Sequence, residues 1–386
     1  MNEMLRIIAD ENMPHARTFF SRLGMVETVS GRSIRKEMVK KADALLVRSV
    51  TSVNEALLKG TNVSFVGTAT IGTDHVDQAW LSEQGIGFAS APGCNAESVA
   101  NYMASALVFA AGRMGWTLSE CVLGIVGVGN CGSRVERVGR ALGMEVRLND
   151  PPLARATGKA KYRPLEELLD CDVLALHVPL TREGPDPTWR LIDEGVLKRM
   201  KPGTVVINAC RGFVLDEGAA LQRLAAGRLG GLILDAWENE PNIHPNLLRA
   251  AMLGTPHIAG YSYDGKLNGT RMIYEAACRH FGRPPETVRV EMPQPAVEHI
   301  TVRGGQREFD AAATEVLMGA YPVLRDDAAL RRAAAPDPEA VGPVFDRLRK
   351  TYPVRREFEA TNLRLIDAPA NWTEQFSAMG FHVEKD

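Results

Sequence analysis

The chain has 386 residues, of which 45% are hydrophobic and 24% are charged, with a formal net charge of −2. A chain of this length exceeds one ordinary core, so two or three domains are expected. The near-neutral charge excludes a global positive field that would draw the protein to nucleic acid or to anionic membranes. Any anion that the protein binds must therefore be held by local groups.

The six cysteines lie far apart and form no CxxC pair, which argues against a zinc knuckle or a thioredoxin-type motif. The first residues do not have the pattern of a signal peptide, and the sequence has no apolar run of about eighteen residues, as a membrane span would need. We therefore expect no metal, no nucleic-acid partner and no membrane partner. A cytoplasmic location with free thiols is expected.

The first ninety residues alternate short apolar runs with segments of helical spacing. The strand candidates are residues 5–9, 44–48 and 63–67, and a helix candidate covers residues 13–23. Strand and helix in alternation favour a parallel sheet with helices on its faces. The Pro92–Gly93 dipeptide interrupts this pattern, and the small-residue helix predicted at 96–112 is interpreted as a connector.

A second unit begins at Cys121 and continues for about 140 residues, a usual domain size. Its strand candidates are residues 122–126, 145–148, 173–177, 204–208 and 232–235. The first of these runs is apolar throughout, as a strand buried on both faces should be. Helical patterns separate the strands, so a second doubly wound (Rossmann-like) parallel sheet is predicted.

The composition changes after Gly282, where four prolines between 284 and 295 predict a linker. Beyond the linker, strand candidates at 300–302 and 363–366 and a helix candidate at 309–319 predict a small C-terminal α/β domain. The expected fold class is therefore α/β, with two doubly wound domains and this third one.

The glycine loop GVGNCG covers residues 127–132. A lone GxGxxG is a weak signal, but here a strand precedes it, a helical segment follows it, and acidic Asp150 ends the next strand, as in a dinucleotide-binding unit. Gly127 permits the tight turn, Gly129 lets the backbone approach a pyrophosphate, and Gly132 allows close packing of helix on strand.

Asn130 and Cys131 complete this loop, and the helix N-terminus there offers free N–H groups to phosphates. Asp150 can accept hydrogen bonds from the adenosine ribose, and its charge repels a 2′-phosphate, which predicts NAD rather than NADP. The alternative is a structural glycine turn in which Asp150 caps a helix.

Three polar segments follow predicted strands of the second unit, where ligands bind in open α/β sheets. The segments are residues 208–212, 235–241 and 255–261. Oxidation of a hydroxy acid needs a cation for the carboxylate, a base for the hydroxyl proton and a carboxylate that orients the base. Arg211, His257 and Glu240 supply these groups in that order.

Each of these side chains also has a simpler interpretation. A single arginine after a strand is often a surface ion pair, and a single histidine is often structural. The three together, each at a strand end of a nucleotide-binding unit, favour the catalytic interpretation. Asp235 is expected near the nicotinamide or as a structural cap, whereas His75 and His177 are interpreted as structural because the sequence shows no carboxylate paired with them.

The glycine loop together with NACRG, DAWENEP and TPHIAG resembles the D-2-hydroxyacid dehydrogenase superfamily. The likeness spans the chain and is sharpest toward members that act on a phosphorylated hydroxy acid and carry an extra C-terminal segment for dimerisation. The stretches that carry it are ADENMP (9–14), VRSVT (47–51), VGTATIGTDHVD (66–77), APGCNAESVA (91–100), INACRG (207–212) and GTPHIAGYSYDGKLNGT (254–270).

This resemblance implies NAD-dependent oxidation of 4-phosphoerythronate to 2-oxo-3-hydroxy-4-phosphobutanoate in pyridoxal 5′-phosphate (vitamin B6) biosynthesis. By likeness, the active-site residues are Arg211, Glu240 and His257, the proton carrier; the substrate-binding residues are Ser49, Thr70 and Tyr261; and the cofactor-binding residues include Asp150, Asp235 and Gly260. Val178 stands where relatives carry threonine, so only its backbone can contact the cofactor.

A substrate phosphate requires a local anion site. Arg48 beside Ser49, in a loop after a strand, is the leading candidate, with Lys266 as a helper. The alternative for Arg48 is a surface salt bridge. For Ser49, Thr70 and Tyr261 the alternative is ordinary turn or packing chemistry.

The resemblance assigns functions to the predicted domains: residues 1–95 with 262–281 bind substrate, 96–261 bind NAD, and 283–386 form a homodimer. The active site is expected in the cleft between the first two, and its closure would expel water. Two alternatives remain. One is another dehydrogenase of the superfamily, such as phosphoglycerate dehydrogenase, and the other is a non-catalytic NAD-sensing binding protein.

Overall fold

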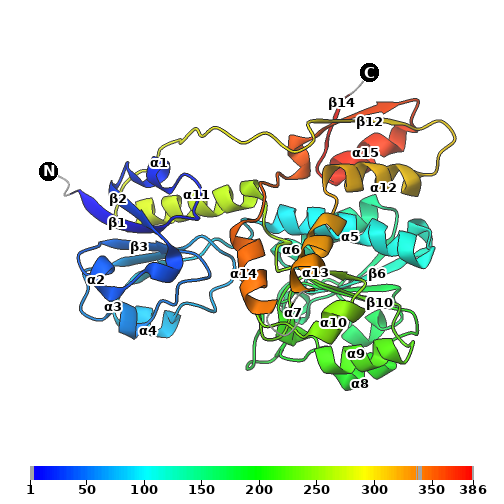
Figure 1. Cartoon of the computed structure of the whole chain (residues 1–386), viewed down its shortest axis with the longest axis horizontal. Helices are drawn as coiled ribbons and strands as arrows, with labels where there is room; N and C mark the ends of the chain where they lie inside the picture. Colours follow the sequence, from blue (N-terminus) through cyan, green and yellow to red (C-terminus); the bar gives the residue numbers. More distant parts are fainter. Residues whose placement is uncertain (1–3, 336, 338–340, 385–386) are drawn as a thin grey trace. The chain divides into compact units, whose positions relative to one another are not determined.

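The computed structural model describes residues 4–335, 337 and 341–384. By their internal contacts they form two compact units. Unit 1 comprises Met1–Asn95 and Tyr261–Pro293, and unit 2 comprises Ala96–Gly260 and Gln294–Asp386. Figure 1 labels many of the elements of both units, which are described separately.

Unit 1 is built on a parallel five-stranded sheet of order β2-β1-β3-β4-β5. Its strands are β1 (Leu5–Asp10), β2 (Gly24–Val29), β3 (Ala44–Val47), β4 (Phe65–Thr68) and β5 (Gly87–Ala89). Its helices are α1 (Ala16–Phe20), η1 (Gly31–Ser33), α2 (Lys36–Val39), α3 (Glu55–Leu58), α4 (Gln78–Glu83) and α11 (Tyr263–His280). Every residue of β3 and β4 is buried, as expected for central parallel strands covered on both faces.

Helix α11 reaches unit 1 from late in the chain and completes its core. Tyr274 of α11 packs edge-on against Phe19 and Phe20 of α1, with ring centroids 5.5 and 5.6 Å apart. The helix predicted at 13–23 is shorter, because the chain turns at Gly24 into β2, a strand that the sequence analysis missed. A Cβ at Gly24 would lie 2.0 Å from the Leu5 carbonyl oxygen, so the tight pairing of β2 with β1 requires glycine.

Unit 2 contains a parallel six-stranded sheet of order β11-β10-β9-β8-β6-β7. Its strands are β6 (Val122–Val126), β7 (Glu145–Asn149), β8 (Val173–Leu176), β9 (Val205–Asn208), β10 (Gly231–Leu234) and β11 (Leu253–Gly254). Its helices are α5 (Ala96–Met114), η2 (Leu118–Glu120), α6 (Asn130–Ala141), α7 (Pro151–Thr157), η3 (Leu165–Leu168), α8 (Glu194–Arg199), η4 (Gly212–Val214), α9 (Glu217–Ala225) and α10 (Pro245–Ala250). The chain changes direction across the sheet at β6, which places a topological switch point beside the glycine loop.

The C-terminal part of unit 2 forms a separate parallel sheet of order β12-β13-β14. Its elements are β12 (His299–Arg303), α12 (Phe309–Ala320), α13 (Leu324–Ala334), α14 (Val341–Lys350), η6 (Phe358–Ala360), β13 (Asn362–Ile366), α15 (Ala370–Ala378) and β14 (His382–Glu384). The sequence predicted β12, α12 and β13 but not α13, α14, α15 or β14. Leu330 of α13 and Phe345 of α14 are fully buried in the same apolar cluster as Trp237.

These shared core residues explain why the contacts divide the chain into two units, whereas the sequence predicted three domains. The three-domain division and its boundaries stay a prediction. None of the helices within the described residues combines the length and the apolarity needed to cross a membrane. In the same part of the chain, no group of three or more histidine, cysteine or acidic side chains is arranged to hold a metal ion.

Candidate active site

The glycine loop has the geometry of a phosphate-binding turn. Gly127 adopts φ +88°, which favours glycine. A Cβ at Gly132 would lie 1.9 Å from the carbonyl oxygen of Gly127, so α6 can pack against the turn only with glycine there. A Cβ at Gly129 would meet nothing within 4 Å, so the space beside it is open, as the approach of a pyrophosphate requires.

Asp150 lies between the glycine loop and the next helix. One carboxylate oxygen accepts the Leu153 N–H at 2.9 Å and caps α7, while the other accepts the Val128 N–H at 2.8 Å. Within the protein, Asp150 therefore acts as the helix cap that the structural alternative predicted. Each oxygen retains a further lone pair, so the same carboxylate can still accept a ribose hydroxyl. That contact remains a prediction.

The other residues of this sheet edge surround the loop without adding charge. Burial raises the pKa of the Cys131 thiol to about 11, so the thiol is neutral. A Cβ at Gly127 would lie 2.7 Å from Cγ1 of Val178, so Val178 packs directly against the glycine loop. Both ring nitrogens of His177 are buried without a hydrogen-bond partner, and burial lowers the pKa of His177 to about 4. The structural interpretation of His177 is thereby favoured.

Glu240 and His257 form a direct pair. His257 Nδ1 lies 2.7 Å from Oε2 and 3.0 Å from Oε1 of Glu240, and Oε1 also accepts the Trp237 N–H at 2.8 Å. Burial opposes ionisation of Glu240, but the charge and hydrogen bonds of His257 prevail and lower the pKa of Glu240. Because Nδ1 faces this carboxylate, Nε2 is the ring nitrogen left for a substrate proton.

His257 itself has a left-handed backbone, with φ 54°. Such a conformation in a side-chain-bearing residue costs about 1–3 kcal/mol and persists only when its surroundings hold it. Arg211 follows β9, the neighbour of β10, and its side chain is half-buried with Nη1 donating to the Cys210 carbonyl at 2.9 Å. The carboxyl ends of these parallel strands meet at one sheet edge, so Arg211 and Glu240 share that edge.

Asp235 supports the His257 loop from inside. It is fully buried, and its oxygens accept the Thr255 hydroxyl at 2.7 Å and the N–H groups of Ile258 at 2.7 Å and Ala259 at 2.9 Å. Burial raises the pKa of Asp235, while these groups and His257 act in the opposite direction. This bonding favours the structural alternative for Asp235. Gly260 is half-buried at the end of the same loop.

In unit 1, the residues predicted for the phosphate gather around Tyr261. The guanidinium carbon of Arg48 lies 5.9 Å and the Lys266 ammonium 4.7 Å from the centroid of the Tyr261 ring. Arg48 Nη1 also donates to the Asn12 carbonyl at 3.1 Å. Ser49 is exposed beside Arg48. Two cations on one phenol ring form a positive patch suited to an anion.

Thr70 belongs to a hydroxyl network in the same unit. Its Oγ1 lies 2.7 Å from Oγ1 of Thr68 and donates to the Gly72 carbonyl at 2.9 Å. Thr68 in turn lies 2.9 Å from His75 Nε2. His75 is thus held by a threonine, in agreement with a structural role. The turn-chemistry alternative for Thr70 describes these bonds equally well.

Glu217 is a buried acid near the pair that the sequence analysis did not identify. It is 5% exposed and accepts the Glu238 N–H at 2.7 Å. Burial, with the nearby charges of Glu238, Glu240 and Asp216, raises the pKa of Glu217 to about 8. No sequence signal could have marked it, because a glutamate in the first turn of a helix such as α9 is ordinary.

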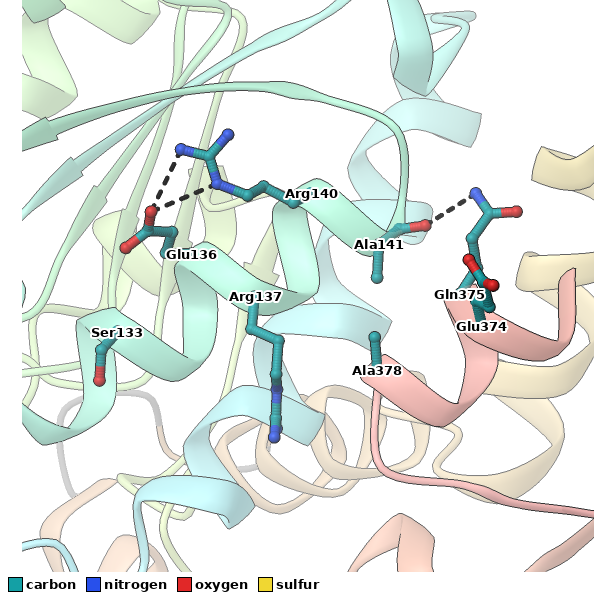
Figure 2. Close-up of a pocket in the computed structure, with 8 residues that line it drawn as sticks. All are labelled: Ser133, Glu136, Arg137, Arg140, Ala141, Glu374, Gln375 and Ala378. Carbon is teal, nitrogen blue, oxygen red and sulfur yellow. Dashed lines mark hydrogen bonds and ion pairs between the residues drawn. The ribbon is translucent and has the colours of Figure 1, made fainter. Parts of the chain in front are cut away.

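A pocket of about 470 Å³ lies elsewhere in unit 2, where α15 meets α6 (Figure 2). Gln375 Nε2 donates to the Ala141 carbonyl at 2.9 Å, and Arg140 pairs with Glu136 at 3.1 Å. None of Arg211, Glu240 and His257 lines it. This pocket is therefore distinct from the candidate active site.

Residues 97–259 match the family model of the NAD-binding domain of D-isomer specific 2-hydroxyacid dehydrogenases. Residues 292–380 match a second family model, a domain of unknown function. An erythronate-4-phosphate dehydrogenase of Klebsiella pneumoniae (strain 342) is 47% identical over 369 residues, which cover 95% of this chain and 96% of that protein. Another erythronate-4-phosphate dehydrogenase, of Marinobacter nauticus, is 46% identical over 384 residues, which cover 98% of this chain and 99% of that protein.

The chain belongs to the erythronate-4-phosphate dehydrogenase family. Among solved structures, D-lactate dehydrogenase from Aquifex aeolicus, in complex with NAD and lactic acid, aligns with a TM-score of 0.60 at 26% identity and covers 72% of this chain and 96% of its own. The predicted α/β fold and the predicted NAD cofactor are thereby confirmed.

Proposed function

We propose that this NAD-dependent dehydrogenase oxidises 4-phosphoerythronate to 2-oxo-3-hydroxy-4-phosphobutanoate in pyridoxal 5′-phosphate biosynthesis. The names of the relatives support the substrate, and the relatives match the chain almost end to end. The observation that carries the chemistry is the 2.7 Å contact between His257 Nδ1 and Glu240 Oε2. It leaves Nε2 as the base for a hydroxyl proton.

We assign one role to each side chain of the catalytic set. Arg211 holds the substrate carboxylate through its guanidinium fork. His257 takes the C2 hydroxyl proton, and Glu240 stabilises the imidazolium that forms. The C2 hydrogen leaves with its electron pair as the C–O bond becomes C=O. NAD, when bound, supplies the hydride acceptor at C4 of its nicotinamide, and Asn130, Cys131, Gly132, Asp150, Val178 and Gly260 would lie around it.

We assign the substrate phosphate to unit 1. Arg48 and Lys266 approach the ring of Tyr261, and this arrangement supports an anion site despite a net charge of −2. A guanidinium binds a phosphate through two parallel hydrogen bonds, and an ammonium adds a point charge. Ser49 and Thr70 supply hydroxyl groups in this proposal.

Two further properties belong to the proposal. The C-terminal segment from 283 to 386 forms a homodimer interface, as the resemblance implies. The protein acts in the cytoplasm, and the six cysteines, all free, are compatible with a reducing compartment. Among non-enzymatic alternatives, an NAD-sensing protein has no need for a half-buried carboxylate bonded to a histidine, so the Glu240–His257 pair favours the enzyme.

The test is NADH formation, followed by absorbance, with 4-phosphoerythronate, 3-phosphoglycerate and unphosphorylated erythronate. A parallel set with an added 2-oxo acid recycles cofactor that stays tightly bound. We expect the highest kcat/KM with 4-phosphoerythronate. Preference for 3-phosphoglycerate would keep the mechanism but reassign the substrate. Absence of turnover in both sets, from protein that binds NADH, would favour the sensor.

A further inference from the structure

The backbone directly after His257 is clamped from both sides. On one side, the carboxylate of Asp235 accepts hydrogen bonds from the backbone N–H groups of Ile258 and Ala259. On the carbonyl side, Ala259 O accepts the Ser98 hydroxyl at 2.9 Å and Arg355 Nη2 at 2.5 Å. Arg355 lies 96 positions further along the chain, so a C-terminal residue completes the clamp.

Arg355 is held in a buried cluster of its own. Its side chain is buried, and its guanidinium carbon lies 4.3 Å from the Tyr321 ring centroid and 5.9 Å from that of Tyr352. Both phenols donate to Asp326 Oδ2, at 2.7 and 2.8 Å. Burial opposes the charge, but the two tyrosines and Asp326 raise the pKa of Arg355, so the guanidinium stays charged.

Arg355 differs from an ordinary surface arginine, because its side chain is buried. A buried cation is costly unless it is paired, and a bond from a charged donor is roughly twice as strong as one between neutral groups. Here the guanidinium directs Nη2 to the Ala259 carbonyl and also to Ser98 Oγ. The bond therefore fixes the Ala259 peptide two residues after His257, whose left-handed backbone requires such support.

The same C-terminal segment also reaches the loop of Glu240. A Cβ at Gly342 of α14 would lie 2.2 Å from Asn242 Oδ1 and 3.6 Å from Pro241, so α14 packs directly on the residues after Glu240. After burial and His257, the positive charge of Arg349 on α14 contributes to the lowered pKa of Glu240. The C-terminal segment thus contacts the loops that carry both Glu240 and His257.

We propose that Arg355 is a positioning residue that fixes His257 through the Ala259 carbonyl. The segment that matches a domain of unknown function then has a role in the active site of its own chain, in addition to any role in dimerisation. This inference rests on the proposed function for its kinetic consequence, because His257 must be the proton acceptor for its placement to affect turnover.

The experiment compares three variants of the full chain. Arg355→Met removes the charge and the donors, and Arg355→Lys retains the charge with one ammonium in place of the fork. Arg347→Met is the matched control, since Arg347 is an exposed arginine on α14. We expect Arg355→Met to lower kcat about 10- to 100-fold, as a displacement of about 1 Å does, with KM changed less than about threefold. Arg355→Lys should recover part of the loss, and the control should match the wild type.

A second readout does not depend on the substrate. The side-chain ¹H–¹⁵N signals of His257, identified by their loss in His257→Gln, should shift in Arg355→Met but not in Arg347→Met. If the wild type does not oxidise 4-phosphoerythronate, the proposed function fails, yet this spectrum still tests the positioning role.

The proposal is overturned if folded Arg355→Met keeps the wild-type kcat and the wild-type His257 signals. If Arg355→Met does not fold, Tyr352→Phe provides the milder change, because it removes only the hydroxyl that donates to Asp326. It should give a smaller loss in kcat with a shifted His257 signal. Wild-type kcat and spectra in both Tyr352→Phe and Arg355→Lys would equally overturn the proposal.

Discussion

Glu240 Oε2 lies 2.7 Å from His257 Nδ1, and the two residues follow the neighbouring strands β10 and β11. The Glu240 side chain is only 20% exposed, so the hydrogen bond is partly shielded from water, and the lowered local dielectric strengthens it. A histidine held in this way presents its other nitrogen in a fixed direction. The proposed base and the carboxylate that orients it thus lie together at one sheet edge, and the first prediction rests on this arrangement.

Replacement of His257 by alanine should abolish proton transfer without disturbing the glycine loop. We expect His257→Ala to lower kcat by about 10²–10⁴-fold, the usual contribution of a general base. NADH binding, measured by fluorescence titration, should stay near normal. His382→Gln, at an exposed histidine of β14, is the control and should behave as wild type. Retained turnover in His257→Ala would remove this residue from the mechanism.

Two glycines of the loop should separate cofactor binding from stability. In Gly129→Ala the new methyl group meets nothing in the protein, so the free energy of unfolding should hardly change while NADH binding weakens because the pyrophosphate cannot approach. In Gly132→Ala the methyl group overlaps the Gly127 carbonyl, which should destabilise the fold by about 1–3 kcal/mol. Denaturation measures the free energy of unfolding of each variant, and fluorescence titration measures its affinity for NADH. Equal effects of the two variants on stability would contradict the loop geometry.

Asp150 should determine the preference for NAD over NADP. In Asp150→Asn the single amide oxygen can still accept one of the two N–H groups of Val128 and Leu153, but the charge that repels a 2′-phosphate is gone. We expect the ratio of kcat/KM for NADP to that for NAD to rise by about tenfold, which corresponds to about 1.4 kcal/mol. Steady-state kinetics with both cofactors provide the measurement. An unchanged ratio would leave Asp150 with its capping role alone.

Arg48 should contribute to binding of the phosphorylated substrate only. Arg48→Ala removes a charged donor beside Tyr261, so KM for 4-phosphoerythronate should rise about 10- to 100-fold, the range for loss of a charge-assisted hydrogen bond. The rate with unphosphorylated erythronate should not change. Arg271→Ala, at an exposed arginine on α11 of the same unit, serves as the control. An unchanged KM in Arg48→Ala would show that the anion site lies elsewhere.

Glu217 should make stability fall as the pH rises. Its pKa is raised from 4.5 to about 8 in the folded protein, so the folded state prefers the protonated form. This contribution is fully present below the unfolded value of 4.5 and is lost as the pH rises through 8. Glu217→Gln removes this dependence, because glutamine stays neutral.

We therefore expect Glu217→Gln to gain stability over wild type between pH 5 and pH 8 by on the order of 3 kcal/mol, measured by urea denaturation at both pH values. Asp216, Glu238, Glu240 and Arg190 surround this group and are the same in both proteins. Glu183→Gln, at an exposed glutamate, should show no such gain. If wild type and Glu217→Gln differed in stability by the same amount at pH 5 and at pH 8, the pKa of Glu217 would not be raised in the folded protein.

Much of the fold and of the candidate site could be predicted from local patterns. The strands around the glycine loop are continuous apolar runs, so β6, β8 and β9 were placed to within two residues. Strand β2 was missed because its residues alternate weakly and it is set by pairing with β1. Helices α13 and α14 were missed because their apolar side chains are buried only by packing against the core around Trp237, a contact that the local sequence does not reveal.

The sequence by itself determined the α/β class and the position of the glycine loop, and it predicted the residue types of the candidate active site, because these depend on short-range spacing and on strand ends. Only the tertiary structure decided that Asp235 is fully bonded inside the His257 loop, that Glu217 is a buried acid and that Arg355 reaches Ala259. Burial and hydrogen-bond partners come from segments far apart in the chain. Their consequences for charge therefore appear only once the chain is folded.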